Sequence, residues 1–337
     1  MKRFFFLIPV FVLFLACIAG DAGNGTGNGP VGGTGTPPGD EGSTATSLAE
    51  NPLSAICRTR GGDIFVSSDG GKPLVSSDGS TFTVLDSTKR TLNGVTCDVQ
   101  NASATNVWFV GTGGAILFFD GSTLASQDSS TTNDLNAVFA LDASEVVAVG
   151  NSGTIIRLGG GSWGPTTNSV ADTENLFGIG GTTAEMFAVG THKTIQVSAN
   201  SGATWEAIGT AVTNLLPSGA QMNAVWVDPV SGDVFIVGNA GIILHRTGAN
   251  WKLDETNTVS NLLAVQGTSN SGILAVGTDG VILVSDGTTW ASVTNPAGES
   301  FSLTGVLALT SGSFAVGTDG TDGILLKVVG SDWTQLF

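Results

Sequence analysis

The sequence predicts an all-β protein: a seven-bladed β-propeller of four-stranded blades, preceded by a signal peptide and a flexible linker. Three observations lead to this prediction. A unit of about 40 residues recurs seven times, each unit holds four short apolar runs, and 49 glycines among 337 residues can supply the turns between them. A lone four-stranded blade leaves apolar surface exposed on both faces, so such units are stable only when they pack against neighbours in a ring.

The amino terminus has the pattern of an export signal. Lys2 and Arg3 precede an apolar run of 13 residues, which is short for a membrane span, and the run ends at Cys17. The ending FLAC resembles the lipobox of bacterial lipoproteins, although Phe14 stands where Leu is usual. This resemblance implies that residues 1–16 are a lipoprotein signal peptide and that Cys17 is lipidated. Simple secretion after cleavage at a later small residue is the alternative.

The segment after the signal predicts a tether. Residues 17–51 are dominated by Gly, Thr, Pro and Asn and contain almost nothing that a core could bury, as in flexible linkers. We therefore expect a propeller over residues 52–337, held away from the membrane and attached to it through the lipid alone. Because Asp does not follow Cys17, resemblance to bacterial sorting favours the outer membrane or cell surface as the location in the envelope.

The first strand of each unit follows one template, from LSAIC at residue 53 to LTGVL at residue 303. Its third residue is always Ala or Gly, which we expect where the innermost strands crowd the propeller axis. These residues are Ala55, Gly94, Ala137, Gly178, Ala224, Ala264 and Gly305.

The second strand is an apolar run, such as EVVAVG or DVFIVG, that closes on glycine in six units. That glycine fits a turn requiring either a positive φ or a close backbone approach. A third run follows, and an aromatic residue opens the fourth strand in six of the seven units. These residues are Phe82, Trp163, Trp205, Trp251, Trp290 and Trp333, with Leu124 in the second unit. An aromatic that recurs once per blade is expected to pack between blades rather than to bind a glycan.

The repeats also resemble a known family. The units LNAVFALDASEVVAVGNSGTIIRLGGGSW and MNAVWVDPVSGDVFIVGNAGIILHRTGANW resemble the neuraminidase-type (Asp-box) repeats of the photosystem II assembly/stability-factor family, and are similar to propeller lipoproteins of myxobacteria. The resemblance implies the fold over residues 53–337 and leaves the function open, because propellers host enzymes, scaffolds and binding proteins. It further implies an Asp-box turn, with Asn for Asp, at Ser198, Asn200, Gly202, Thr204 and Trp205.

Catalysis is not expected. The chain has no tyrosine, the residue that sialidases use as nucleophile, so sialidase activity is excluded. The alternative to a binding role is an envelope glycoside hydrolase or lyase that uses two acidic loop residues. Asp63, Glu145, Glu185 and Asp233, however, recur at one equivalent position before the second strand and are interpreted as turn residues of the repeat.

The net charge of the chain limits the classes of partner that it is expected to bind. Twelve basic and 28 acidic residues give a net charge of −16, which disfavours nucleic acid. We expect a monomer that binds an envelope or extracellular protein or glycan without a cofactor. Calcium is the one ion considered, because the turn TDGTDG would bring Asp319 and Asp322 near Asp279 of the neighbouring blade. That turn lacks the spacing of an EF-hand, and polar hairpin tips are the alternative.

A binding site is expected on the end of the propeller that carries the turns between second and third strands and the links between blades. The residues expected on this face are Asp69, Lys72, Asn151, His192, Lys193, Asn239, Asp279 and Asp319.

Cys57 and Cys97 remain as a candidate pair in an oxidising compartment. They lie in the first strands of two consecutive units but are one residue out of register. This offset would turn the two side chains toward opposite faces of adjacent strands, which argues against a disulfide and favours buried free thiols; a disulfide between blades is the other interpretation.

The last unit indicates how the ring of blades closes. The ending DWTQLF predicts that the last unit supplies its own fourth strand, and residues 44–51 are the alternative source of a strand for blade seven.

Overall fold

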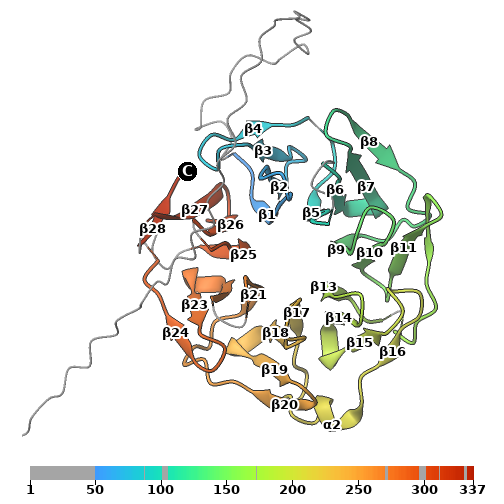
Figure 1. The fold of residues 1–337 in the computed structure, drawn as a ribbon, viewed down its shortest axis with the longest axis vertical. Helices are drawn as coiled ribbons and strands as arrows, with labels where there is room; N and C mark the ends of the chain where they lie inside the picture. The colour runs from blue at the N-terminus through green and yellow to red at the C-terminus, as the bar shows by residue number, and fades with distance from the viewer. Residues whose placement is uncertain are drawn as a thin grey trace, which may run out of the picture. The chain divides into compact units, whose positions relative to one another are not determined.

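The computed structural model describes residues 50–86, 88–100, 105–171, 173–269, 272–295, 301–310, 312–329 and 332–337. These residues form seven antiparallel sheets of four consecutive strands each, arranged in a ring (Figure 1). The predicted seven-bladed propeller is confirmed. The expected signal peptide, the lipidated Cys17 and the tether before residue 50 lie outside the described residues.

Within each blade, the four strands follow one another in sequence order from the axis to the outer edge of the ring (Figure 1). The first strands are β1 Leu53–Arg58, β5 Leu92–Cys97, β9 Leu135–Ala140, β13 Leu176–Gly181, β17 Met222–Val227, β21 Leu262–Gly267 and β25 Ser302–Leu307. The second strands are β2 Ile64–Ser68, β6 Val107–Gly111, β10 Val146–Gly150, β14 Met186–Gly190, β18 Val234–Gly238, β22 Ile273–Gly277 and β26 Phe314–Thr318.

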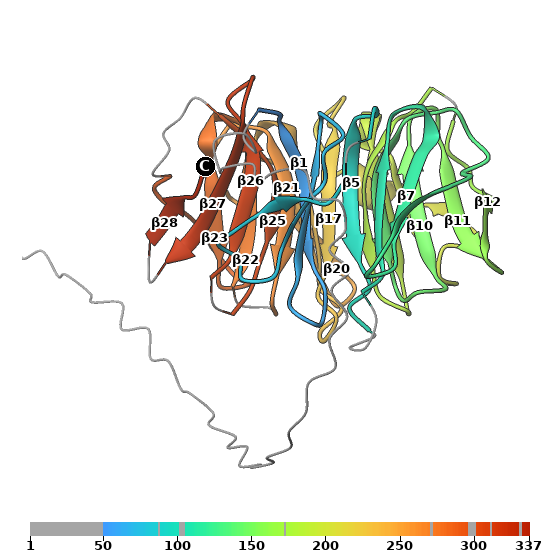
Figure 2. The same ribbon diagram turned by 90° about the horizontal axis from the view of Figure 1, so that it is seen from above.

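The outer strands complete each sheet. The third strands are β3 Leu74–Ser76, β7 Ala115–Phe119, β11 Ile155–Gly159, β15 Ile195–Ser198, β19 Ile243–Thr247, β23 Ile282–Ser285 and β27 Gly323–Val329. The fourth strands are β4 Thr83–Val84, β8 Leu124–Gln127, β12 Ser162–Pro165, β16 Glu206–Ala207, β20 Asn250–Leu253, β24 Trp290–Ser292 and β28 Asp332–Gln335. Seen edge-on in Figure 2, the strands run between the two ends of the ring.

Helical segments are short. The α-helix α2 spans Thr210–Thr213, and 3₁₀ turns follow four of the second strands: η1 Thr112–Gly114, η2 Thr191–Lys193, η3 Asn239–Gly241 and η4 Thr278–Gly280. Within the described part of the chain, no helix has the length and apolarity needed to cross a bilayer.

The core consists of seven apolar clusters, one at each interface between neighbouring blades. In the cluster between blades two and three, for example, Trp108 and Val110 pack with Leu135 and Val146. All five residues of β10 are buried, because both faces of a second strand are covered by adjoining blades. This double coverage explains why the second strands are continuous apolar runs instead of alternating patterns.

The small residues of the first strands separate the blades at the axis, as predicted. A Cβ on Gly178 would lie 2.7 Å from Cα of Ala224 in the next blade, and a Cβ on Gly305 would lie 3.0 Å from Cα of Ala55. Larger side chains at this position would therefore force neighbouring first strands apart.

The glycine that closes the second strand is required by a close approach. Gly111 has φ −169° and Gly277 has φ −171°, both extended, so a positive φ is not the reason. A Cβ on Gly277 would lie 1.8 Å from the backbone oxygen of Asn261, just before the first strand of the same blade. Of the two predicted reasons for this glycine, backbone proximity is the correct one.

Every first strand also has a β-bulge between the first and third positions of the sequence template, which are Leu303 and Gly305 in β25. In four blades, the side chain at the second position of the template donates a hydrogen bond to a backbone oxygen of the next first strand. These bonds run from Asn93 to Leu135 (2.9 Å), from Asn136 to Leu176 (2.8 Å), from Asn223 to Leu262 (2.7 Å) and from Thr304 to Leu53 (2.7 Å). The bulges thus hold neighbouring blades together with polar contacts as well as apolar ones.

Cys57 and Cys97 form a disulfide between blades one and two, with 5.8 Å between their Cα atoms. The fifth residue of a first strand faces the next blade, as Phe139 does, whereas the sixth faces the preceding blade, as Ala140 does. Cys57 is a fifth residue and Cys97 is a sixth. Because facing blades present opposite faces to each other, the one-residue offset is what brings the two sulfurs together, so the argument that it separates them was wrong.

The ring closes between two complete blades. Blade one contains β1–β4 and blade seven contains β25–β28, so neither sheet borrows a strand among the described residues. Leu53 and Ile56 pack with Leu307 and Val316 across this seam, and β1 lies beside β25 in Figure 1. Lys327 Nζ also donates to the backbone oxygen of Gly79 at 2.7 Å.

Candidate functional site

The turns between second and third strands and the links between blades meet at one end of the propeller, which we call the turn face. Backbone hydrogen bonds join four of these turns to the following link: Gly153 N to Glu174 O (2.7 Å), Lys193 N to Ala220 O, Gly241 N to Ser260 O and Gly280 N to Phe301 O (each 2.8 Å). The structure places all eight residues expected on the ligand face in these turns. They come from six of the seven blades, so they form an arc rather than one compact cluster.

The tips of these turns present different side chains on one backbone conformation. Ser152, His192, Ala240 and Asp279 are exposed and have positive φ between 48° and 57°. This left-handed conformation is disfavoured for residues with a Cβ by roughly 1 kcal/mol or more. Residues held in such conformations often occur at functional sites, which makes these tips candidates for partner contacts.

Some predicted ligand residues instead support the framework. Asn136 and Asn223 of the bulges donate through Nδ2 to Oδ1 of Asn151 and Asn239, respectively, at 2.9 Å each. Asn151 and Asn239 therefore help to orient the bonds between blades. The sequence placed both at the correct end, but it contained no signal for these partners, which lie on the first strand of the same blade.

Lys193 is also engaged. Its Nζ donates to the backbone oxygens of Thr213 (3.2 Å) and Leu216 (2.7 Å), at the end of α2. Cations are favourable near the last carbonyls of a helix, so Lys193 stabilises the link between blades four and five.

Glu174 completes a polar group that the sequence analysis missed. Its Oε2 accepts a hydrogen bond from Thr191 Oγ1 and lies 3.0 Å from Nδ1 of His192, whose side chain is 72% exposed. The Thr191 hydroxyl lowers the pKa of Glu174, and His192 lowers it further against the opposing effect of burial. Glu174 is consequently an ionised acceptor on the turn face at neutral pH.

The three aspartates considered for calcium do not form a site. Among the described residues, no group of three or more His, Cys, Asp or Glu is placed to hold a metal ion, so Asp279, Asp319 and Asp322 do not meet as the calcium hypothesis required. Asp319 Oδ1 instead accepts the backbone N–H groups of Thr321 and Asp322, and these bonds lower its pKa. The carboxylate is used to close its own turn, as expected for a polar hairpin tip.

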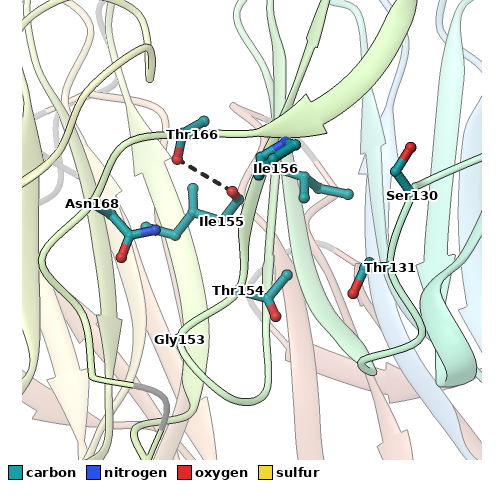
Figure 3. Close-up of a pocket in the computed structure, with 9 residues that line it drawn as sticks. Ser130, Thr131, Gly153, Thr154, Ile155, Ile156, Thr166 and Asn168 are labelled. Carbon is teal, nitrogen blue, oxygen red and sulfur yellow. Dashed lines mark hydrogen bonds between the residues drawn. The ribbon is translucent and has the colours of Figure 1, made fainter.

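Two shallow pockets of the turn face lie at equivalent places on blades three and four. The blade-three pocket is about 210 Å³ and lies between Ser130 and Thr131 of one link and Thr154, Thr166 and Asn168 of blade three and the next link (Figure 3). The blade-four pocket is about 240 Å³. Its polar lining residues are Ser169, Glu174, His192, Lys193, Thr194, Gln196 and Thr213.

The S-x-N-x-G-x-T-W turn lies between β15 and β16, at the opposite end. Ser198 Oγ accepts from Gly202 N (2.9 Å), Asn200 Oδ1 accepts from Thr204 N (3.0 Å), and Trp205 Nε1 donates to Gly202 O (3.0 Å). Trp205 is 3% exposed and packs between blades three and four. All five motif residues therefore stabilise a turn.

The aromatic residues of the fourth strands are packing residues as well. Phe82, Trp163, Trp205, Trp290 and Trp333 are all buried, and Trp251 packs half-buried against Phe187. They provide no exposed platform on which a glycan could stack.

The acidic residues before the second strands differ in their surroundings. Glu145 pairs with Arg157 of its own blade, and Glu185 pairs with Arg246 of blade five at 2.6 Å. Arg246 also lies over the ring of Phe187, 5.3 Å from its centroid. Glu185 therefore links two blades, a contact that its turn position alone did not indicate.

His245 belongs to another buried polar contact, between blades five and six. Its Nδ1 lies 3.0 Å from Oδ2 of Asp254, and Trp290 Nε1 donates to the same oxygen at 3.1 Å. His245 stacks on Phe235, with 4.1 Å between the ring centroids. His245 and Asp254 are only nine residues apart, on and just after the outer two strands of blade five.

Comparisons with known proteins support the fold. No protein-family model and no curated protein matches the chain. Among solved structures, YCF48 bound to D1 peptide is similar with a TM-score of 0.63 at 17% identity, over 83% of this chain and 93% of that one. YCF48 from Cyanidioschyzon merolae (0.61, 14%, 84% and 97%) and the WD40 β-propeller domain of Doa1 (0.61, 14%, 82% and 95%) are also similar.

Proposed function

We propose that this chain is a lipid-anchored binding scaffold of the bacterial cell envelope, which holds a protein partner on its turn face without catalysis. The observation that supports the proposal is the contrast between the residues that pack the blades and the exposed residues at the tips of the turns. The residues that pack the blades recur from unit to unit, whereas the exposed tips carry Ser152, His192, Ala240 and Asp279 on the same backbone. A rigid frame with varied tips is suited to recognition, because little conformational entropy is lost on binding.

The charge indicates the chemistry of that partner. With a net charge of −16, the protein attracts cationic segments and repels anionic ones. Asp279, Asp319 and Asp322 are exposed on the turns of blades six and seven. A basic protein segment is therefore the partner that we expect, and the peptide in the similar YCF48 structure supports a peptide partner for this fold.

The envelope location is part of the proposal. The lipobox-like ending before Cys17 supports an outer-membrane or cell-surface lipoprotein, and the Cys57–Cys97 disulfide supports an oxidising compartment. Metabolic labelling with a fatty-acid analogue tests the anchor: the wild type incorporates the label and Cys17→Ser does not. Labelling of both proteins, or of neither, would contradict lipidation at this residue.

A crosslinking pull-down from the native envelope tests the binding role. Ser152→Gly, His192→Gly and Asp279→Gly remove three tips while relieving the positive φ, so the fold is retained. We expect the triple variant to lose partners that the wild type captures. The control is Val230→Thr, because Val230 is 88% exposed on a hairpin at the opposite end. An unchanged partner list for the triple variant would place the site elsewhere.

A glycan is the second candidate partner, and the polar pocket of blade four favours it. A glycan array with the purified chain tests this class directly. Reproducible glycan turnover in that assay would replace the binding role by the alternative, a glycoside hydrolase or lyase.

A further inference from the structure

Blade four departs from the repeat at positions that surround one pocket. Where β15 has Gln196, the other six blades have an apolar residue at the equivalent position of the ladder: Leu74, Leu117, Ile156, Leu244, Leu283 and Leu326. Lys193 likewise stands where other turns have Gly114, Gly153, Gly241 and Gly280. Both substituted residues line the blade-four pocket. These polar exceptions are therefore concentrated at one site.

Gln196 supplies a polar side chain to the wall of the blade-four pocket. It is 3% exposed, and its Oε1 accepts a hydrogen bond from Ser169 Oγ at 3.1 Å. Among the described residues, its amide nitrogen has no hydrogen-bond partner. This nitrogen is not among the fully buried atoms of the described chain that lack a hydrogen-bond partner, which are Trp108 Nε1, Arg246 Nε and Asp254 Oδ1, so it is accessible from the pocket that Gln196 lines. A ligand in this pocket can therefore accept a hydrogen bond from it.

The surrounding groups alternate between donors and acceptors. Lys193 is a cation whose Nζ already donates to Thr213 O and Leu216 O, and Glu174 is an ionised acceptor. Lys193 and Glu174 thus give the lining of the pocket one cationic and one anionic side chain. An ionic ligand of either sign would therefore meet one like charge, in addition to the −16 that repels anions.

The apolar residues that line the pocket and the volume of the pocket restrict the class of ligand further. Val170, Ile195 and Ile208 supply apolar surface beside these polar groups. At about 240 Å³, the pocket is smaller than the roughly 300–1,000 Å³ of drug-sized sites. Sugar hydroxyls both donate and accept hydrogen bonds, and a sugar ring has C–H groups that can cover apolar surface.

From these contacts we infer that the blade-four pocket binds one residue of a neutral sugar, with Gln196 Nε2 donating to a hydroxyl and Glu174 accepting from another. The inference rests on the proposed binding role of the turn face and specifies the ligand for its second candidate partner, a glycan. It does not require the protein partner.

Saturation-transfer NMR tests the inference with glucose, galactose, mannose and N-acetylglucosamine as neutral probes, and with acetate as an anionic probe. We expect saturation of at least one neutral sugar by the wild-type chain, and none of acetate. Gln196→Leu restores the residue type of the other blades, so we expect it to keep or raise the melting temperature while weakening sugar binding about tenfold. Thr166→Val in the blade-three pocket is the matched control and should leave binding unchanged.

Three outcomes would overturn the inference: no sugar is saturated, acetate is bound instead, or Gln196→Leu leaves sugar binding intact. A loss of melting temperature in Gln196→Leu without sugar binding would assign Gln196 a structural role. The envelope pull-down, repeated with Gln196→Leu, distinguishes this result from the scaffold proposal. If the variant captures the same protein partners as the wild type, the scaffold proposal is retained even when no sugar is bound.

Discussion

At the scale of single residues, Lys193 combines two opposing effects. Its φ of 64° is a conformation that favours glycine, so the backbone is strained by roughly 1 kcal/mol. Its Nζ offsets this strain by donating to the carbonyls of Thr213 and Leu216. The same side chain lines the blade-four pocket, so strain, helix capping and the candidate site coincide at one position.

Two substitutions of Lys193 separate these effects. Lys193→Ala keeps the strain and removes both hydrogen bonds, so we expect the free energy of unfolding to fall by about 1–2 kcal/mol. Lys193→Gly removes the bonds but relieves the strain, so we expect a smaller loss. Urea denaturation measures both values. Equal losses for the two variants would show that φ at this position carries no strain.

At the scale of elements, three of the hairpins between third and fourth strands are closed by an aspartate side chain. In three of these turns, the carboxylates of Asp78, Asp120 and Asp286 accept the backbone N–H groups two and three residues later. The bond from Thr81 and then that from Ser80 lower the pKa of Asp78 to about 2. The equivalent backbone bonds, together with neighbouring hydroxyls, also lower the pKa values of Asp120 and Asp286.

These turns predict loss of stability in acid. A carboxyl whose pKa is lower in the folded chain stabilises it above the unfolded pKa of about 4, and this stabilisation is lost as the pH falls through the folded value. We therefore expect the melting temperature to fall between about pH 4 and pH 2, as measured by circular dichroism. The triple variant Asp78→Asn, Asp120→Asn, Asp286→Asn should show a shallower fall. An identical pH profile for wild type and variant would contradict this role of the turns.

The strands show which parts of the fold can be predicted from local sequence. The apolar runs, the closing glycines and the aromatic of the fourth strand place every blade, because each feature depends on residues within about 40 positions of one another. The turn-face position of residues such as Asp279 follows from the same order. Individual side-chain partners did not follow from the repeat: the pairs Glu174–His192 and Asp254–His245 each join a strand or turn to a nearby segment where the repeat has no shared residue.

At the scale of the whole molecule, the ring depends on contacts between blades. Each interface has its own apolar cluster, four interfaces add a bulge hydrogen bond, and one adds the Cys57–Cys97 disulfide. The seam between blades one and seven has no shared strand among the described residues. Closure thus uses the same packing as the other interfaces.

The disulfide predicts a measurable contribution to stability. It joins residues 40 positions apart, and cross-links of this span restrict the unfolded chain by about 3–4 kcal/mol. Cys57→Ser with Cys97→Ser should therefore lower the free energy of unfolding by about that amount in a denaturant titration. Non-reducing peptide mapping of the wild type checks the bond itself. Recovery of the two cysteine peptides as separate free thiols would contradict the pairing.

The sequence by itself determined the number of blades, the four strands in each and the end at which the turns meet, because periodic apolar runs and turn residues are local features of the chain. Only the tertiary structure decided which faces oppose each other. It showed that a fifth residue of one first strand meets a sixth residue of the next, that Lys193 caps α2, and that Gln196 has an unpaired nitrogen in a pocket. These features depend on how strands, turns and links pack in space, between blades for the disulfide and within blade four for Lys193 and Gln196, and the pattern of the repeat does not specify that packing.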